Sequence, residues 1–151
     1  MKSLSEKDCM RKYRIILSRT EKKIKNSKTT TSDELYNFGK KYIHTFKGVY
    51  MQDSNIKFNT SAECFIINTD LEGQRGEHWI SIYKTKDQNF YIYDSFGRKS
   101  KKLLPYFIKD KKYIDADYDP EQMVYQSNCG QRCLAWLLFR EKYGIYNALK
   151  I

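Results

Sequence analysis

The sequence lacks long apolar runs, and it has few cysteines and only two histidines. No segment approaches the roughly 18 consecutive apolar residues of a membrane-spanning helix, and the first ten residues lack the apolar middle of a signal peptide. We therefore expect an intracellular protein with no membrane partner. Without secretion, four cysteines do not indicate a disulfide framework, so at least one thiol is expected to be free for chemistry.

The chain is rich in aromatic residues and in positive charge. Its length of 151 residues and its 15% aromatic content favour one packed domain. The net charge of +10 is concentrated: residues 1–28 carry ten basic and three acidic side chains, and a second basic stretch spans 98–112. Such runs favour contact with polyanions such as nucleic acid, although a solvated surface explains each run equally well.

Helical spacing of apolar residues predicts a basic amphipathic helix over 5–26, with Ser5 as its N-cap. A polar linker follows, and Thr31 and Glu34 fit a capping box that begins a second helix. Gly39 is expected to end or bend that helix. We divide the chain into a basic N-terminal helix and linker, 1–30, and a second domain, 31–151.

Beyond residue 60 the pattern changes to short segments rich in Ile, Tyr and Phe. Three of these segments are predicted strands, 63–68, 78–84 and 89–97, and a short helix is predicted over 103–108. The acidic stretch 113–122 is typical of a turn. A helix that is apolar on most faces begins at Cys129 and is stopped by Gly144.

The residues with the clearest chemistry lie where these elements begin and end. A cysteine in the first turn of a buried helix, such as Cys129, has its thiolate stabilised by the helix dipole, and its own amide can bind an oxyanion. Gly130 is expected to leave room for a substrate backbone. Of the two histidines, His44 and His78, only His78 begins a predicted strand after a glycine-containing loop. Asp94, at the end of the neighbouring strand, is placed to orient that histidine.

Other interpretations of these residues stay open at this point. Cys129 fits buried packing, Asp94 fits a turn, and Trp79 fits either the cleft or an apolar sheet position. Cys133 follows one helical turn after Cys129 and is interpreted as a small buried thiol. A metal site made of Cys129, Cys133 and His78 is a poor alternative, because zinc usually takes four ligands.

The two remaining cysteines complete the set of thiols. Cys64 lies in a predicted strand and is interpreted as a core residue. Cys9 lies on the basic helix and is expected to be an exposed thiol.

Three ordered blocks resemble the adenovirus-type cysteine endopeptidases and their relatives in Maverick or Polinton-type virus-like elements. The blocks are GEHWISIY at 76–83, YIYDSFG at 91–97 and QMVYQSNCGQRCLAWL at 122–137. Two upstream blocks, at 34–53 and 63–70, also resemble that family, so the similarity covers about residues 31–143. The resemblance implies an adenain-like α+β fold, with a mixed, mostly antiparallel sheet packed against the nucleophile helix and further helices on its flanks.

By this resemblance His78, Asp94 and Cys129 are the catalytic triad. The glutamine of the oxyanion hole falls at Gln122, seven residues before the cysteine, while Gln126 fits if the loop is compressed. The aspartate at position 94 departs from the glutamate of adenovirus enzymes and is similar to the mobile-element and SUMO-protease branches. The acid therefore does not settle the substrate.

The implied function is cleavage after small residues, at Gly-containing sites, in capsid or core precursors. The resemblance implies a monomeric protein, which is found in the host nucleus or cytoplasm or is packaged in the virion. The implied chemistry requires no cofactor or metal. DNA and an activating peptide are the two candidate activators. Two alternatives are a deconjugating protease for a ubiquitin-like modifier and an inactive DNA-binding or capsid-associated protein of the same fold.

Overall fold

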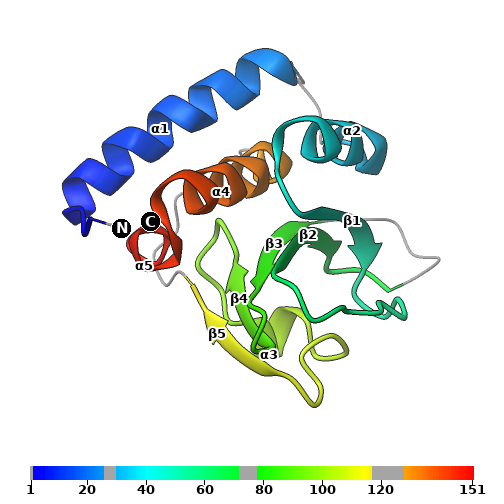
Figure 1. The fold of residues 1–151 in the computed structure, drawn as a ribbon. Helices are drawn as coiled ribbons and strands as arrows, with labels where there is room; N and C mark the ends of the chain where they lie inside the picture. The colour runs from blue at the N-terminus through cyan, green and yellow to red at the C-terminus, as the bar shows by residue number, and fades with distance from the viewer. Residues whose placement is uncertain (1, 26–29, 72–77, 117–127) are drawn as a thin grey trace.

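A computed structural model describes residues 2–25, 30–71, 78–116 and 128–151, which form an α+β fold around one sheet (Figure 1). The helices are α1 (Glu6–Lys23), α2 (Ser32–Tyr42), α3 (Ser100–Leu103), α4 (Cys129–Tyr143) and α5 (Ile145–Ala148). The strands are β1 (Phe46–Met51), β2 (Glu63–Asn68), β3 (Trp79–Lys84), β4 (Asn89–Tyr93) and β5 (Lys112–Asp115). Among these described residues, no helix is both long and apolar enough to cross a membrane.

The five strands pair in their order along the chain, β1-β2-β3-β4-β5. The central strands β2, β3 and β4 are antiparallel, whereas β1 is parallel to β2 and β5 is parallel to β4. The sheet is therefore mixed, and the expectation that it would be mostly antiparallel is wrong. The long connections 52–62 and 94–111 return the chain to the end of the sheet from which it came, which parallel pairing requires.

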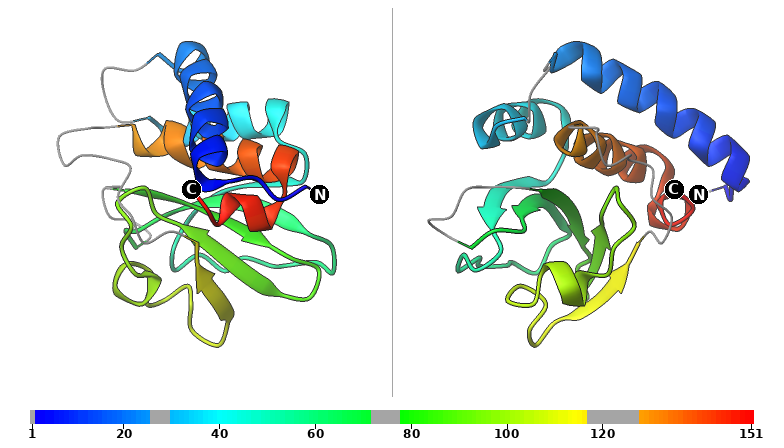
Figure 2. Two further views of the ribbon diagram at one scale, coloured as in Figure 1. Left: turned by 90° about the vertical axis from the view of Figure 1, so that its left-hand side faces the viewer. Right: turned by 180° about the vertical axis from the view of Figure 1, so that it is seen from behind.

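The molecule has three layers, with α1 outermost, α4 beneath it and the sheet beneath α4 (Figure 2). Alternation along the strands separates two clusters of buried side chains. Cys64, Ile66 and Tyr93 face α4, whereas Phe65, Ile67 and Ile82 face the other side of the sheet. That second face is covered by the connecting segments rather than by a long helix.

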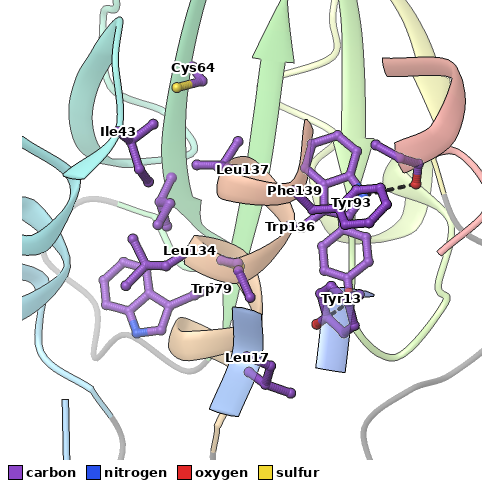
Figure 3. Close-up of a cluster of buried hydrophobic side chains, with 14 of the residues drawn as sticks. Tyr13, Leu17, Ile43, Cys64, Trp79, Tyr93, Leu134, Trp136, Leu137 and Phe139 are labelled. Atoms are coloured by element: carbon purple, nitrogen blue, oxygen red, sulfur yellow. Dashed lines mark hydrogen bonds between the residues drawn. The ribbon is translucent and has the colours of Figure 1, made fainter. Parts of the chain in front are cut away.

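The core between α4 and the sheet contains several aromatic rings among its aliphatic side chains (Figure 3). The ring of Tyr93 stacks on the ring of Trp136, with centroids 5.3 Å apart. Tyr13 of α1 reaches the same place, where its hydroxyl lies 3.2 Å from the hydroxyl of Tyr93. Helix α1 therefore shares a hydrophobic core with α4 and β4. The division of the chain into residues 1–30 and 31–151 stays a prediction.

Helix α1 has the predicted N-cap, because the side chain of Ser5 accepts a hydrogen bond from the amide of Asp8. Its apolar side contains Cys9, which is fully buried. The expectation that Cys9 is exposed is wrong: Cys9, Tyr13 and Leu17 lie on the stripe that packs against α4.

Helix α2 begins with the predicted capping box between Thr31 and Glu34. The helix continues to Tyr42, so the expectation that Gly39 ends it is wrong, whereas a bend at Gly39 stays a prediction. A Cβ atom at position 39 would lie 2.4 Å from the ring of Phe46. The glycine therefore makes room for the first residue of β1.

Several other boundaries differ from the sequence-based expectation. Strands β1 and β5 and helix α5 were not anticipated, and β5 occupies the start of the stretch interpreted as a turn. The short helix expected over 103–108 lies earlier, as α3. The last long helix is confirmed from Cys129 to Tyr143, and Gly144 stops it with a φ of 86°.

Candidate active site

The first turn of α4 lies at the end of the sheet where β3 begins and β4 ends. His78 directly precedes β3, Asp94 directly follows β4, and Cys129 is the first residue of α4. All three side chains are buried. The fold therefore brings together the three residues that the sequence singled out, from positions 16 and 35 residues apart along the chain.

Cys129 occupies a helix start whose N-cap, Asn128, makes no side-chain capping hydrogen bond. The first amides of a helix have no acceptor within the helix and carry its positive dipole end. The sulfur of Cys129 accepts hydrogen bonds from two backbone amides, those of Trp79 and Gly130. These donors and the dipole favour a negative charge on the sulfur.

His78 lies between the other two residues. Its Nε2 lies 2.5 Å from Oδ1 of Asp94, and a side-chain hydrogen bond also joins it to Cys129. Because Nε2 faces Asp94, Nδ1 is the ring nitrogen left for the sulfur. Asp94 thus fixes both the orientation and the tautomer of the ring, as a general base requires. The backbone of His78 is held as well, since its carbonyl accepts a hydrogen bond of 3.0 Å from the amide of Thr69.

Asp94 is itself held by Arg98, four residues further along the chain. Both the backbone amide of Arg98 and its Nε donate to Oδ2 of Asp94, at 2.9 and 3.0 Å. The guanidinium also stacks over the ring of Phe96, with 4.8 Å to the centroid, and that ring packs 5.1 Å from the ring of His78. Each oxygen of Asp94 therefore has its own donor, and the imidazole has an aromatic wall.

The charges of the three groups support one another. Burial by itself favours the neutral thiol, but His78 and the amides of Trp79 and Gly130 hold the pKa of Cys129 below its ordinary value. Burial also disfavours a charged imidazole, yet hydrogen bonds to Asp94 and Cys129 raise the pKa of His78. Burial acts to raise the pKa of Asp94 as well, but His78 and Arg98 hold it below the usual range. These directions favour a thiolate paired with an imidazolium.

The other thiols have the opposite environment. Cys133 is fully buried, and burial raises its pKa well above the ordinary value. Burial likewise raises the pKa of Cys64 to about 11. Both are core residues, as interpreted from the sequence, and neither is placed to react. Among the residues that the structure describes, no group of three or more His, Cys, Asp or Glu side chains is arranged to hold a metal ion.

Gly130 does not have the predicted role. A Cβ atom at this position would lie 2.9 Å from Cβ of Thr30 and 3.1 Å from Cδ2 of Leu35. The missing side chain therefore allows the first turn of α4 to pack against the start of α2, and it does not open space for a substrate. Trp79 is buried, and its Nε1 donates to the carbonyl of Thr30 at 3.0 Å.

Two predicted residues are not placed. Gln122 and Gln126, the two candidates for the oxyanion hole, lie outside the described residues. The other histidine, His44, is exposed just before β1, at the end of the sheet far from His78, where its amide donates to Glu141.

The sequence analysis did not predict the residues that hold the three candidate side chains in place. Arg98 stands four residues after Asp94, a spacing at which a turn returns a basic side chain to the acid, so the motif DSFGR contained a signal. Thr30 and the amide of Trp79 gave no comparable signal, because their contacts depend on packing between α2, α4 and β3.

No protein-family model matches the chain. Over an alignment of 93 residues it is 29% identical to a protein named Protease from Bovine adenovirus C serotype 10. The alignment covers 51% of this chain and 47% of that protein, so the chain spans about half the length of this relative. The similarity indicates a distant relationship to a viral protease.

Proposed function

We propose that this chain is a cysteine endopeptidase that cleaves after small residues, at Gly-containing sites, in viral or virus-like capsid or core precursors. The observation that carries the proposal is the contact of Cys129, His78 and Asp94 at the first turn of α4. The distant similarity to an adenovirus protease supports the viral and proteolytic parts.

In the proposed reaction the sulfur of Cys129 attacks the carbonyl carbon of the scissile bond as a thiolate. His78 holds the proton at Nδ1, and Asp94 holds the ring through Nε2. The negative oxygen of the tetrahedral intermediate is stabilised by the amide of Cys129 at the helix start. By the resemblance, Gln122 supplies a second donor.

Collapse of that intermediate breaks the carbon–nitrogen bond, and His78 protonates the leaving amine. A thioester between the substrate acyl group and Cys129 remains. The neutral His78 then takes a proton from water, whose oxygen attacks the thioester. The carboxylic acid leaves, and the thiolate–imidazolium pair is restored.

The substrate class is tested by two substrates that end their acyl part with the same residues. One is a capsid-type peptide with an internal Gly-Gly site, and the other is a ubiquitin-like protein fused through Gly-Gly to a reporter. The proposal predicts faster cleavage of the peptide. Cleavage of the fusion alone would instead favour the deconjugating protease, and cleavage of neither by a protein whose Cys129 is reactive would remove the proposed substrates.

A second proposal, binding of duplex DNA, rests on the outward face of α1. Eight basic side chains of the N-terminal segment are exposed: Lys2, Lys7, Arg11, Arg14, Arg19, Lys22, Lys23 and Lys25. Among the described residues, only Arg11 has an ion-pair partner within this segment, Asp8 at 3.7 Å. This arrangement supports contact with phosphates that does not depend on base sequence.

Fluorescence anisotropy with a random duplex tests this second proposal. The logarithm of the affinity should fall linearly with the logarithm of the salt concentration, because bound cations are released from the DNA. Neutralising Arg14, Lys22 and Lys25, which are all exposed, should reduce the slope. A slope that neither these changes nor neutralisation of Lys99, Lys101 and Lys102 alters would leave the charge without a role in DNA binding.

A further inference from the structure

Thr30 lies just before α2 and is 98% buried beside the first turn of α4. Its two polar groups bond to the site from opposite sides. The carbonyl accepts from Nε1 of Trp79 at 3.0 Å, and the hydroxyl donates to Oε1 of Gln131 at 2.8 Å. One residue therefore joins the strand that directly follows His78 to the helix that carries Cys129.

The same residue is in tight contact with Gly130. A Cβ atom on Gly130 would lie 2.9 Å from Cβ of Thr30 and 3.1 Å from its Oγ1, so the helix turn and Thr30 touch with no space between them. Gln131 extends the contact, since its Nε2 donates to the carbonyl of Ile24 at 3.4 Å. The C-terminal cap of α1 is thus tied to the same turn.

These contacts matter because of which residues Thr30 holds. The sulfur of Cys129 accepts from the backbone amides of Trp79 and Gly130, and these are the residues against which Thr30 packs and bonds. We propose that Thr30 is a positioning residue that holds the two backbone donors of the Cys129 sulfur in place. This inference rests on the proposed function, because it concerns the reactivity of the proposed nucleophile.

The physical argument is one of hydrogen-bond geometry. Donors to a charged acceptor lose strength quickly when distance or angle relaxes, and a buried thiolate has no water to replace them. His78 also faces the sulfur from the sheet, with Asp94 behind it, and the neutral thiol of Cys133 lies one turn along α4. The carbonyl and hydroxyl of Thr30 bond to Trp79 and Gln131 and not to these groups, so loosening Thr30 should act on the thiolate of Cys129 through its backbone donors.

The test replaces the hydroxyl while keeping the shape. Thr30→Val removes the bond to Gln131, and Thr20→Val is its matched control, because Thr20 is 99% buried and its hydroxyl donates only within α1, to Ile16. The measured quantity is the rate at which iodoacetamide alkylates Cys129 as a function of pH. Peptide mapping confirms that Cys129 is the residue that is alkylated. For Thr30→Val we expect the inflection to rise by about half a pH unit or more towards the ordinary thiol value.

Hydrolysis should change in step with alkylation. In Thr30→Val we expect kcat/KM to fall about tenfold through kcat, because the donors serve the thiolate and not substrate binding. Thr30→Ser keeps the hydroxyl and should restore both readouts, and Thr20→Val should match the wild type. Trp79→Phe removes the donor to the carbonyl of Thr30 and should move the inflection in the same direction, which tests the contact even where Thr30→Val does not fold.

The outcomes separate the two proposals. A wild-type Cys129 that is alkylated with the pH profile of an ordinary thiol would contradict the proposed function itself. A depressed wild-type inflection that stays unchanged in folded Thr30→Val and in Trp79→Phe would overturn the role of Thr30 alone. A shift of equal size in Thr20→Val would also overturn it, because the effect would then follow general loosening of the N-terminal segment.

Discussion

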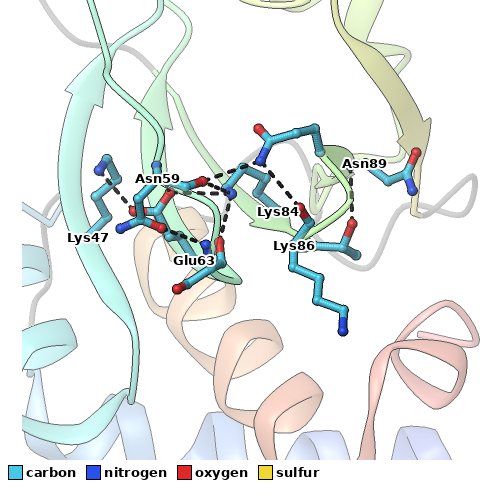
Figure 4. A network of polar contacts seen from close by, with 9 residues as sticks. Lys47, Asn59, Glu63, Lys84, Lys86 and Asn89 are labelled. Atoms are coloured by element: carbon cyan, nitrogen blue, oxygen red, sulfur yellow. Dashed lines mark hydrogen bonds and ion pairs between the residues drawn. The ribbon is translucent and has the colours of Figure 1, made fainter.

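The two ends of β3 both carry buried charged networks, yet only one of them contains a thiol. At the start of the strand His78 joins Asp94 and the sulfur of Cys129. At its end the ammonium of Lys84, on a fully buried residue, bonds the carbonyls of Asn59 and Ser61 at 2.8 and 2.7 Å (Figure 4). Burial and charge alone therefore do not identify a catalytic site.

The difference lies in what each network holds. Glu63 lies 3.6 Å from Lys84 and 3.0 Å from Lys47, and it also accepts from the amide of Asn59. Lys84 and Glu63 bond the backbone of the loop 52–62 and pair with each other, and Lys47 pairs with Glu63. The network therefore fixes the loop between β1 and β2. The network at His78 instead ends on the thiol of Cys129, whose pKa the surrounding donors lower. The first should govern stability and the second reactivity.

The largest expected effect is the loss of hydrolysis when the network at His78 is changed, and its absence would contradict the comparison of the two networks. Cys129→Ala and His78→Ala should each lower peptide hydrolysis by about a thousandfold or more, because these residues make the bond and move the proton. Cys133→Ser, one turn along the same helix, should keep most of the activity. Steady-state kinetics on a Gly-Gly peptide measure all three, and equal losses in the three variants would remove Cys129 from its special position.

The next effect should appear in stability. Lys84→Met leaves Glu63 and two loop carbonyls without their buried partner, so the free energy of unfolding should fall by about 3 to 5 kcal/mol. Lys47→Met is the matched control at the half-buried end of the network and should cost about 1 kcal/mol or less. Urea unfolding measures both. The folded fraction of Lys84→Met should retain normal alkylation of Cys129, and a loss of reactivity without a loss of stability would reverse the assignment.

Arg98→Ala should produce a smaller effect on activity. The variant loses the Nε donor to Asp94 and the stacking on Phe96 but keeps the backbone amide donor, so kcat/KM should fall by about tenfold. Lys99→Ala, the neighbouring exposed cation, serves as the control. The pH profile of hydrolysis should shift only in Arg98→Ala, and a shift in both variants would point to general surface charge.

The smallest effect concerns acid stability. The depressed pKa of Asp94 means that its charged form stabilises the fold above the unfolded pKa of about 3.9, and that this contribution is lost as the pH falls through the lower folded pKa. The stability lost on acidification should therefore be about 1 kcal/mol larger in the wild type than in Asp94→Asn. Urea unfolding between pH 5 and pH 3 measures it, below the range in which the wild-type His78, whose pKa is raised, changes its charge. Parallel curves would mean that Asp94 gains nothing from His78 and Arg98.

The sequence was sufficient for the elements with a strong local pattern. The capping signals of Ser5 and Thr31, the apolar strand 63–68 and the helix that begins at Cys129 are all in the structure where they were predicted. Their hydrophobic periodicity and caps are properties of neighbouring residues. The positions of Cys129, His78 and Asp94 relative to these elements suggested their grouping, and the resemblance to adenovirus-type endopeptidases decided it.

What failed depended on contacts between distant segments. Strand β5 alternates between exposed and half-buried positions and forms because β4 offers it a free edge. The sequence predicts that Gly39 ends a helix and that Gly130 leaves room for a substrate. In the structure each glycine instead allows a neighbouring segment to approach closely. The burial of Cys9 depends on α4, which packs on α1 but lies at the other end of the sequence, so the local pattern of α1 does not show it.

The most direct test of the central claim is labelling with a peptide vinyl sulfone that ends in Gly-Gly. Intact mass and peptide mapping should show one addition, at Cys129, since its pKa is lowered whereas burial raises the pKa of Cys9, Cys64 and Cys133. Labelling should disappear in Cys129→Ala and slow strongly in His78→Ala. A wild-type protein that remains unlabelled at neutral pH, or that is labelled at the same rate without His78, would contradict the assignment of Cys129 as an activated nucleophile.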